Sequence, residues 1–166
     1  MRPCRSLLLA ALCLVAACGA RTTPPSRATA PANADTSAVR AFFLDGITAF
    51  NAHDLDRFTA QFAPDVDMYT PTGWQRGHAA VRERFAATFR QFPSVRMETD
   101  SLRVRTIGPA TVLVDFRWRV YPLGQGPAFH GVGSGTYIRR GKRWLEVVEH
   151  ETVTRVDPEL QHAGAA

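Results

Sequence analysis

The strongest constraint on the fold is the division of the C-terminal half of the chain into four segments of strand length. Glycines and prolines at 108–109, 124–127 and 141 interrupt this region, and such residues favour turns. The segments between them are rich in Val, Thr, Tyr, Phe and Trp, which favour β-strands. The expected strands cover residues 95–107, 110–121, 129–140 and 143–154. Short turns between consecutive strands predict an antiparallel meander.

The second of these segments has one apolar face. That face carries Val112, Val114, Phe116, Trp118 and Val120. Asp115 falls on the opposite face, where we expect contact with solvent. In the first segment, the apolar positions change parity between Met97 and Leu102, which indicates a β-bulge near Asp100.

Helical periodicity precedes the meander. Val39, Phe43 and Phe50 lie on one predicted helix face, with cap candidates at 35–37. A second helix is expected after Asp54, carrying Phe58 and Phe62 and ending at Pro64, and a third over 77–92. A short strand at 66–70 lies between them. This order predicts an α+β fold, with three N-terminal helices packed on one face of a curved antiparallel sheet.

The N-terminus has the features of an export signal. Arg2 and Arg5 precede an apolar stretch that ends in small residues directly before Cys18. This segment resembles a bacterial lipoprotein signal, with residues 1–17 removed and Cys18 lipidated. The resemblance implies an exported protein that is anchored through Cys18 to the lipid bilayer of the cell envelope. The alternatives are an ordinary signal peptide cut nearby and a single N-terminal membrane anchor.

Composition sets the remaining boundaries. Residues 18–35 contain no aromatic or large aliphatic residue and are expected to form a flexible tether. The folded domain is expected over 36–156, followed by a disordered tail over 157–166.

The net charge is small. Without residues 1–17 the formal charge falls from +5 to +3, because Arg2 and Arg5 are lost with no acidic residue. This charge does not indicate a nucleic-acid partner.

Three segments of the chain resemble one superfamily. Residues 49–56 read AFNAHDLD, residues 62–66 read FAPDV, and residues 143–150 read RWLEVVEH. They resemble the nuclear transport factor 2-like superfamily, and its SnoaL-like branch in particular, over residues 36–154. The resemblance implies a cone-shaped α+β barrel with a pocket between helices and sheet, and frequent homodimers. The superfamily contains isomerases, dehydratases, cyclases, epoxide hydrolases and non-catalytic members, so the fold does not settle the function.

Residue identities argue against one activity of this superfamily. Ketosteroid isomerase chemistry needs a carboxylate base and a phenol, and the aligned positions here hold Thr70 and Gly46. We expect no metal, because the histidines show no ligand spacing, and no cofactor. Gly131, Gly133 and Gly135 lack the helix and lysine of a phosphate-binding loop and are expected to permit close packing or curvature.

His130, His150 and Glu146 are the candidate catalytic residues. His130 shares a strand face with Val132 and Thr136, a pattern that favours an inward orientation. Glu146 and His150 share a face of the last strand, as alternate residues do. A histidine in a pocket can shuttle protons or anchor a ligand. The alternatives are a core histidine satisfied by a neighbour, and a buried face of the last strand formed by Leu145 and Val147 instead.

The expected ligand is a small, mostly apolar molecule. The candidate ligand-binding residues are Met68, Thr70, Trp74, Phe89, Trp118, His130, Thr136 and His150. The leading hypothesis is that the domain binds this molecule without catalysis, in a cavity between the helices and the sheet whose walls are apolar and nearly uncharged. The first alternative is a cofactor-independent isomerase, cyclase or hydrolase that uses His130 or His150 with Glu146. The second is a ligand-free interaction module that dimerises through the outer face of the sheet.

Overall fold

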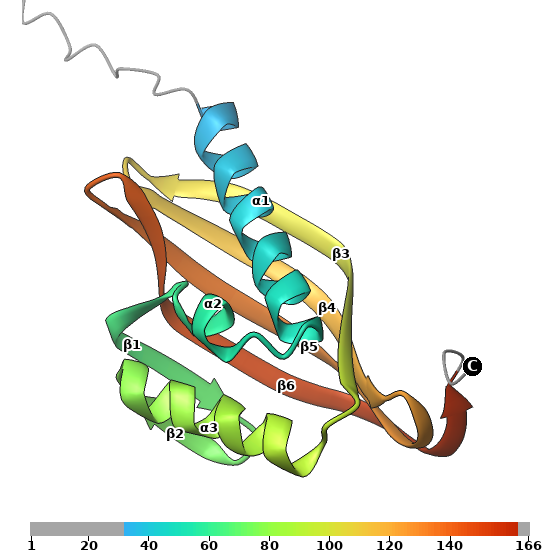
Figure 1. Ribbon diagram of the computed structural model, residues 1–166. Coiled ribbons are helices and arrows are strands. Elements are labelled where there is room, and N and C mark those ends of the chain that lie inside the picture. The colour runs from blue at the N-terminus through green and yellow to red at the C-terminus, as the bar shows by residue number, and fades with distance from the viewer. Residues whose placement is uncertain (1–31, 163–166) are drawn as a thin grey trace, which may run out of the picture.

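A computed structural model describes residues 32–162 (Figure 1). The helices are α1 (Ala32–Asn51), α2 (Leu55–Thr59) and α3 (His78–Gln91). The strands are β1 (Phe62–Thr70), β2 (Gly73–Arg76), β3 (Val95–Gly108), β4 (Thr111–Pro122), β5 (Gly124–Arg140) and β6 (Arg143–His162). Within this range, no helix combines the length and the apolar character that a membrane span requires.

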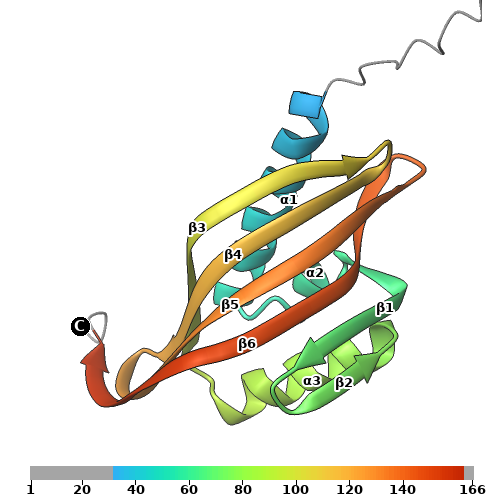
Figure 2. The same cartoon turned by 180° about the vertical axis from the view of Figure 1, so that it is seen from behind.

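The six strands form one curved sheet with the helices on one side (Figures 1 and 2). The strand order is β2-β1-β6-β5-β4-β3. β3 to β6 form the predicted antiparallel meander, and β1 pairs in parallel with β6. The predicted α+β class, with helices on a curved sheet, is therefore confirmed. The sequence reading missed β2, a four-residue strand that pairs with β1 across the expected turn.

The second helix is shorter than expected because its chain joins the sheet early. Asp54 caps α2 by accepting a hydrogen bond from the Arg57 N–H, at 3.0 Å. The helix then ends at Thr59, and the Gln61 carbonyl accepts a hydrogen bond from the Glu146 N–H of β6 at 2.9 Å. Phe62 and Pro64, expected in or beside the helix, therefore belong to β1.

Two further boundaries differ from expectation. α1 begins at Ala32, inside the stretch expected to be a tether. At the other end, β6 continues to His162, which pairs with Gly124 of β5. The expectation of disorder over 157–166 is therefore wrong for residues 157–162, because the start of β5 supplies them with backbone partners. Cys18 and residues 1–31 lie outside the described range.

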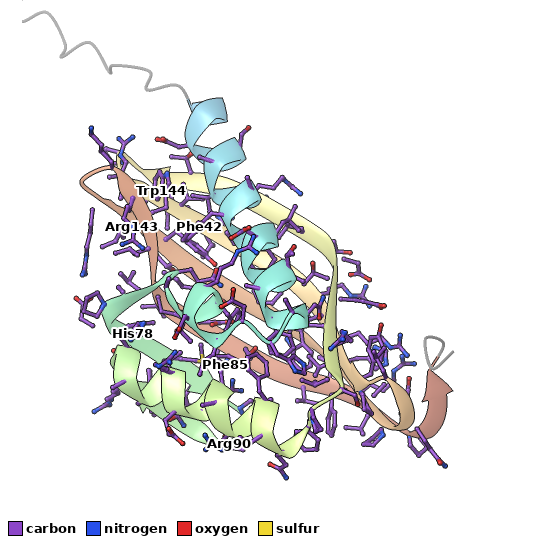
Figure 3. The ribbon with its side chains drawn as sticks, in the orientation of Figure 1. Phe42, His78, Phe85, Arg90, Arg143 and Trp144 are labelled. Atoms are coloured by element: carbon purple, nitrogen blue, oxygen red, sulfur yellow. The ribbon has the colours of Figure 1, made fainter. Side chains whose placement is uncertain are left out.

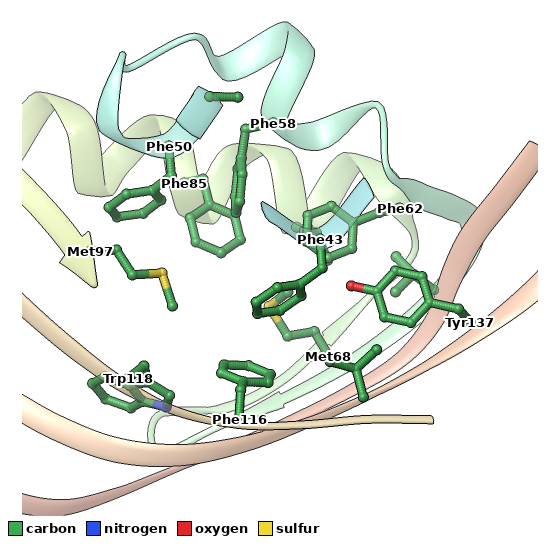
Figure 4. Packing of buried hydrophobic residues seen from close by; sticks show 14 of the residues in the cluster. Phe43, Phe50, Phe58, Phe62, Met68, Phe85, Met97, Phe116, Trp118 and Tyr137 are labelled. Atoms are coloured by element: carbon green, nitrogen blue, oxygen red, sulfur yellow. The ribbon is translucent and has the colours of Figure 1, made fainter. Parts of the chain in front are cut away.

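The helices bury aromatic side chains against the sheet. Phe50 and Phe58 are edge-to-face, with centroids 5.5 Å apart, and Phe58 and Phe85 meet at 4.6 Å. Figure 3 shows Phe85 on the side of α3 toward the rest of the fold and Arg90 on its outer side. Below these rings lie Phe116 and Trp118 of β4, as the alternation in that strand predicts (Figure 4).

Bulges set which residues face the helices. The predicted bulge near Asp100 is confirmed, since two β3 residues oppose one β4 residue between the pairs Asp100–Arg117 and Arg103–Asp115. β6 contains a bulge that the sequence reading did not predict. Tyr137 pairs with Glu146 but Thr136 pairs with Val148, so Val147 is the extra residue. A bulge of one residue exchanges the two faces of the strand beyond it.

Candidate functional site

A cavity of about 410 Å³ lies between the helices and the concave face of the sheet. Aromatic side chains form a large part of its wall, with Phe43 and Phe50 from α1, Phe85 from α3, and Phe116 and Trp118 from β4. Figure 4 shows these rings around a central space, with the helical residues on one side and Trp118 and Phe116 on the other. A space of this size and polarity suits a small organic molecule.

The aromatic rings of β4 in the cavity wall pack directly against glycines of the neighbouring strand β5. A β-carbon at Gly131 would overlap the Trp118 ring, and one at Gly133 would overlap the Phe116 ring. The expectation that these glycines permit close packing is therefore confirmed. The same arrangement turns the other face of β5 outward.

One end of the cavity is acidic, which corrects the expectation of a nearly uncharged wall. Glu146, Glu149 and Glu151 of β6 all line it, together with Arg84 of α3. The bulge at Val147 explains the spacing, because it places both Glu146 and Glu149 on the concave face although they are three residues apart. Glu146 is 3% exposed and Glu149 is 8% exposed.

The carboxyl of Glu146 accepts a hydrogen bond inside the cavity wall and has an altered pKa. The Tyr137 hydroxyl donates to Glu146 Oε2 at 2.9 Å. Burial raises the pKa of Glu146 to about 8, although the Tyr137 hydrogen bond acts in the opposite direction. Burial and the neighbouring carboxyl raise the pKa of Tyr137 well above its usual range. Glu146 therefore exchanges its proton near neutral pH, where it can act as an acid or a base.

Two buried polar atoms in the cavity wall have no hydrogen-bond partner among the described residues. They are Glu149 Oε2 and Trp118 Nε1. Burial, together with Glu146 and Glu151, raises the pKa of Glu149 well above its usual range. A buried polar atom without a partner destabilises a fold by about 1–3 kcal/mol. A bound molecule that reached either atom would supply the missing partner.

Glu151 is the one carboxyl of the three with a cationic partner within the described residues. Arg84 Nη2 lies 3.1 Å from Glu151 Oε2. Burial raises the pKa of Glu151, and the Arg84 guanidinium partly offsets this rise. The Arg84 guanidinium also lies over the Phe85 ring, 4.8 Å from its centroid. Arg84 is thus held at the edge of the cavity by two contacts.

The structure brings two of the candidate residues together in the cavity wall. Trp118 and Glu146 line the cavity. Met68 and Thr70 are buried beside it, and Thr70 Oγ1 donates to the Gly73 carbonyl at 3.0 Å. Trp74 is 54% exposed and packs on Tyr69.

Phe89 and Thr136 also lie outside the cavity wall. Phe89 packs on Phe50 and stacks with His53, whose ring centroid is 4.7 Å away. Thr136 lies on the outer face of β5, since its neighbour Tyr137 points inward.

Both candidate histidines lie on the convex face, so the structure corrects their expected orientation. His130 Nε2 lies 2.8 Å from Asp157 Oδ2. His130 points outward because the glycine face of β5 is the inner one. His150 is exposed and stacks on Tyr69 with centroids 5.3 Å apart. The bulge at Val147 places it opposite Glu146, whereas regular alternation would have put the two together.

Sequence reasoning missed the most polar part of the site. Glu149, Glu151, Arg84 and Tyr137 were not candidates. One signal was present: three glutamates occur within six residues of a strand that is otherwise rich in valine. Over residues 32–162, no group of three or more His, Cys, Asp or Glu side chains has a geometry suited to a metal ion.

Comparison with solved structures identifies the class of fold as cystatin-like. An uncharacterised protein with that fold from Caulobacter vibrioides is 20% identical, with a TM-score of 0.66 over 74% of this chain and 91% of that chain. A putative scytalone dehydratase from Novosphingobium aromaticivorans is 13% identical, with a TM-score of 0.67 over 81% and 92%. A hexachlorocyclohexane dehydrochlorinase from Novosphingobium barchaimii is 15% identical, with a TM-score of 0.66 over 80% and 95%.

The family model that matches the sequence is narrower than the fold. Residues 38–147 match the SnoaL-like domain, so the chain belongs to this family. This confirms the resemblance to the SnoaL-like branch. No protein with a curated description matches the chain.

Proposed function

We propose that this SnoaL-like domain binds a small, mostly apolar molecule that carries one polar group. The observation that carries the proposal is the aromatic cavity of about 410 Å³ with two unpartnered polar atoms in its wall, Glu149 Oε2 and Trp118 Nε1. The apolar body of the ligand would contact the phenylalanine rings, and its polar group would pair with these atoms. Such a ligand removes apolar surface from water and relieves an unfavourable burial.

The test is the binding of a neutral fluorescent dye, 6-propionyl-2-(dimethylamino)naphthalene, to the purified full chain. We expect a blue-shifted emission that saturates with protein concentration. Val153→Phe fills the cavity and should weaken binding about tenfold or more, a loss of about 1.4 kcal/mol. Val148→Phe is the matched control, because Val148 lies on the same strand but is 45% exposed. Equal binding by the two variants would exclude the cavity as the site.

A second candidate function is acid–base catalysis without a cofactor. The observation that favours it is the pKa of Glu146, about 8, at the wall of an apolar cavity. Glu146 as carboxylate would accept a proton from a carbon of the substrate, and a double bond would form as the neighbouring leaving group departs. Two proteins of similar fold are named for the removal of water and of hydrogen chloride. The histidines expected in this role lie on the other face of the sheet.

Catalysis is tested by incubating the full chain with scytalone or hexachlorocyclohexane and measuring product or chloride. Turnover that Glu146→Gln abolishes and His150→Gln leaves intact supports the second candidate. Binding of the neutral dye without turnover of either compound leaves the ligand-binding proposal and counts against catalysis of these two eliminations.

The export and anchoring expected from the N-terminus form a separate proposal. Cys18 would carry the lipid, and the domain that begins at α1 would be held at the cell envelope. Metabolic labelling with a fatty acid tests this: the wild-type chain should be labelled and Cys18→Ala should not. Labelling of the variant would overturn the assignment of Cys18.

Dimerisation is a proposal that rests on the convex face. Val132 of β5 and Val148 of β6 are 44% and 45% exposed there. They are not cross-strand partners, since Val132 pairs with Thr152 and Val148 with Thr136, but both expose apolar surface on the same face, where a partner chain could cover it. Sedimentation at several concentrations tests for a homodimer, with Val148→Asp as the disrupting variant. A ligand-free role as an interaction module is disfavoured by the cavity, which the side chains leave open.

A further inference from the structure

The acidic end of the cavity narrows the class of ligand. Three carboxyls, from Glu146, Glu149 and Glu151, and one guanidinium, from Arg84, line the cavity. Arg84 is committed to Glu151 at 3.1 Å, and Glu146 accepts from Tyr137. Glu149 Oε2 is left without a partner, although the side chain is 8% exposed. Among the three carboxyls, Glu149 is therefore the one with an oxygen to which a ligand could donate a hydrogen bond.

The rest of the wall includes aromatic rings, which attract cations. Phe50, Phe85 and Trp118 turn aromatic rings toward the same space. The faces of aromatic rings carry partial negative charge and stabilise ammonium groups. Arg84 already makes such a contact with Phe85.

We propose that the preferred ligand is an organic cation, an apolar amine whose ammonium group pairs with the free carboxyl oxygen of Glu149. This inference rests on the proposed binding function and specifies the ligand for the same cavity. The hydrocarbon part of the amine would contact the phenylalanine rings of α1 and α3. The ammonium N–H groups would donate to Glu149, where the described residues provide no donor.

The other two ligand classes fit less well. An anionic ligand would be repelled by the Glu151 carboxyl that pairs with Arg84 and would gain only the Trp118 N–H. A neutral ligand could pair with Trp118 or with the carboxylic acid of Glu149, but these are hydrogen bonds between neutral groups. An ammonium group would make a charge-assisted hydrogen bond with ionised Glu149, and this stronger bond separates the cation from both other classes.

Binding of the cation is coupled to release of a proton. The groups that face Glu149 are Glu146 and Glu151 of β6, Tyr137 of β5 and Arg84 of α3. Burial and the two neighbouring carboxyls raise the pKa of Glu149 well above its usual range, so they favour the protonated acid in the free protein. When the ammonium group docks, the carboxylic O–H bond breaks, the proton passes to solvent, and the carboxylate accepts the ammonium hydrogen bond. The affinity should therefore rise with pH up to the pKa of the amine.

The experiment compares three molecules of the same shape, namely 1-adamantanamine, 1-adamantanol and 1-adamantanecarboxylate. Each is titrated against the full chain by calorimetry in two buffers of different ionisation enthalpy, and by displacement of the neutral dye. We expect the amine to bind about tenfold or more tighter than the alcohol, and the carboxylate weakest. The two buffers should report release of protons for the amine and not for the alcohol.

Substitution assigns the effect to Glu149. Glu149→Gln keeps the shape of the side chain and should remove the preference for the amine over the alcohol. Glu83→Gln is the matched control, because it also removes one negative charge but lies on the exposed side of α3, where it pairs with Arg90. The control should retain the preference of the wild-type chain. The comparison of the three molecules on the wild-type chain needs no variant, so it stands if Glu149→Gln fails to fold.

The outcomes separate the two proposals. Dye binding that the alcohol displaces as well as the amine does would overturn the inference and leave the proposed function in place. A chain that binds neither the dye nor any of the three molecules would overturn both. An amine preference that Glu149→Gln leaves unchanged would overturn the role of Glu149.

Discussion

Charged side chains have different partners on the two faces of the sheet. On the convex face, charged side chains meet opposite charges: Arg105 lies 3.5 Å from Asp115, and Arg119 lies 3.5 Å from Glu98. On the concave face, Glu146 bonds a phenol and Glu149 has an oxygen with no partner. The ion pairs on the convex face are solvated and change the stability of the fold little. The unpartnered carboxyl oxygen on the concave face destabilises the fold until a bound molecule pairs with it.

The comparison shows that residue type alone does not identify the site. Histidines, the usual candidates for proton transfer, lie on the convex face. Glutamates of β6 reach the cavity because one residue, Val147, is inserted into the strand. The candidate chemistry of this domain is thus determined by strand register.

The largest expected effect comes from deletion of Val147. The deletion removes the extra residue itself, so β6 would pair regularly with β5 and the residues beyond would keep their faces, with Glu149 concave and His150 convex. The local bend and added twist of the bulge are lost, which changes the shape of the cavity wall at Glu146 and Glu149. We expect the free energy of unfolding to fall by about 4 kcal/mol, measured by urea denaturation, with weaker dye binding. Val147→Ala keeps the bulge and should retain dye binding. A deletion variant that binds the dye like the wild-type chain would refute the importance of the bulge.

The second effect is a dependence of stability on pH that belongs to the concave face alone. The pKa of Glu146 is raised from an ordinary value of 4.5 to about 8 in the folded protein, so the folded state holds a proton that the unfolded state releases. Stability is therefore expected to fall as pH rises from about 5 to about 8, by up to about 1 kcal/mol per pH unit. Denaturation at several pH values measures this slope.

Two variants test whether the change of stability with pH comes from the concave face of the sheet. Glu146→Gln should reduce it, and Glu98→Gln on the convex face should not. Because Glu149 and Glu151 also have raised pKa values, part of the slope should remain in Glu146→Gln. A stability that rises over this range would contradict the burial of these carboxyls as acids.

The third effect concerns the glycine face of β5. In Gly133→Val, the new side chain meets the Phe116 ring, and the overpacking should cost about 2 kcal/mol. Ser134→Val, one residue along and on the convex face, should change stability by less than about 0.5 kcal/mol. Thermal denaturation of the two variants distinguishes them. Equal effects would mean that the faces of β5 are not differentiated as described.

The smallest effect is expected for the convex histidine. His150→Gln removes a stacking contact with exposed Tyr69 and should alter stability by less than about 0.5 kcal/mol and leave dye affinity unchanged. A large loss of dye binding would place His150 in the site and break the comparison between the two faces.

The fold was predictable where a pattern had one periodicity. The apolar face of β4 and the helix over 78–91 follow from regular spacing, and the bulge near Asp100 follows from a change of parity. β2 was missed because four residues carry too little pattern. The end of α2 was misplaced because backbone pairing of Gln61 with Glu146, a long-range contact, outweighs local helical spacing.

The site was less predictable because its two deciding features leave no clear pattern. The middle of the inner face of β5 carries three glycines, Gly131, Gly133 and Gly135, so the outer face looked more apolar and was taken as the inner one. β6 has valine at both parities around residue 147, so a bulge there produces no visible change of period. The inward orientation of Trp118 was predictable since β4 has neither feature.

The parallel pairing of β1 with β6 also constrains how the protein is made. Met68 pairs with Glu149, and the two residues are about eighty positions apart in the chain, as their numbers show. This part of the cavity wall therefore cannot form until β6 has been synthesised. Contacts that span so much chain slow folding, because the intervening loop must close first. During synthesis, the phenylalanine-rich helices emerge before the sheet on which they pack is complete. Nascent chains that stall before β6 should therefore expose apolar surface and require a chaperone.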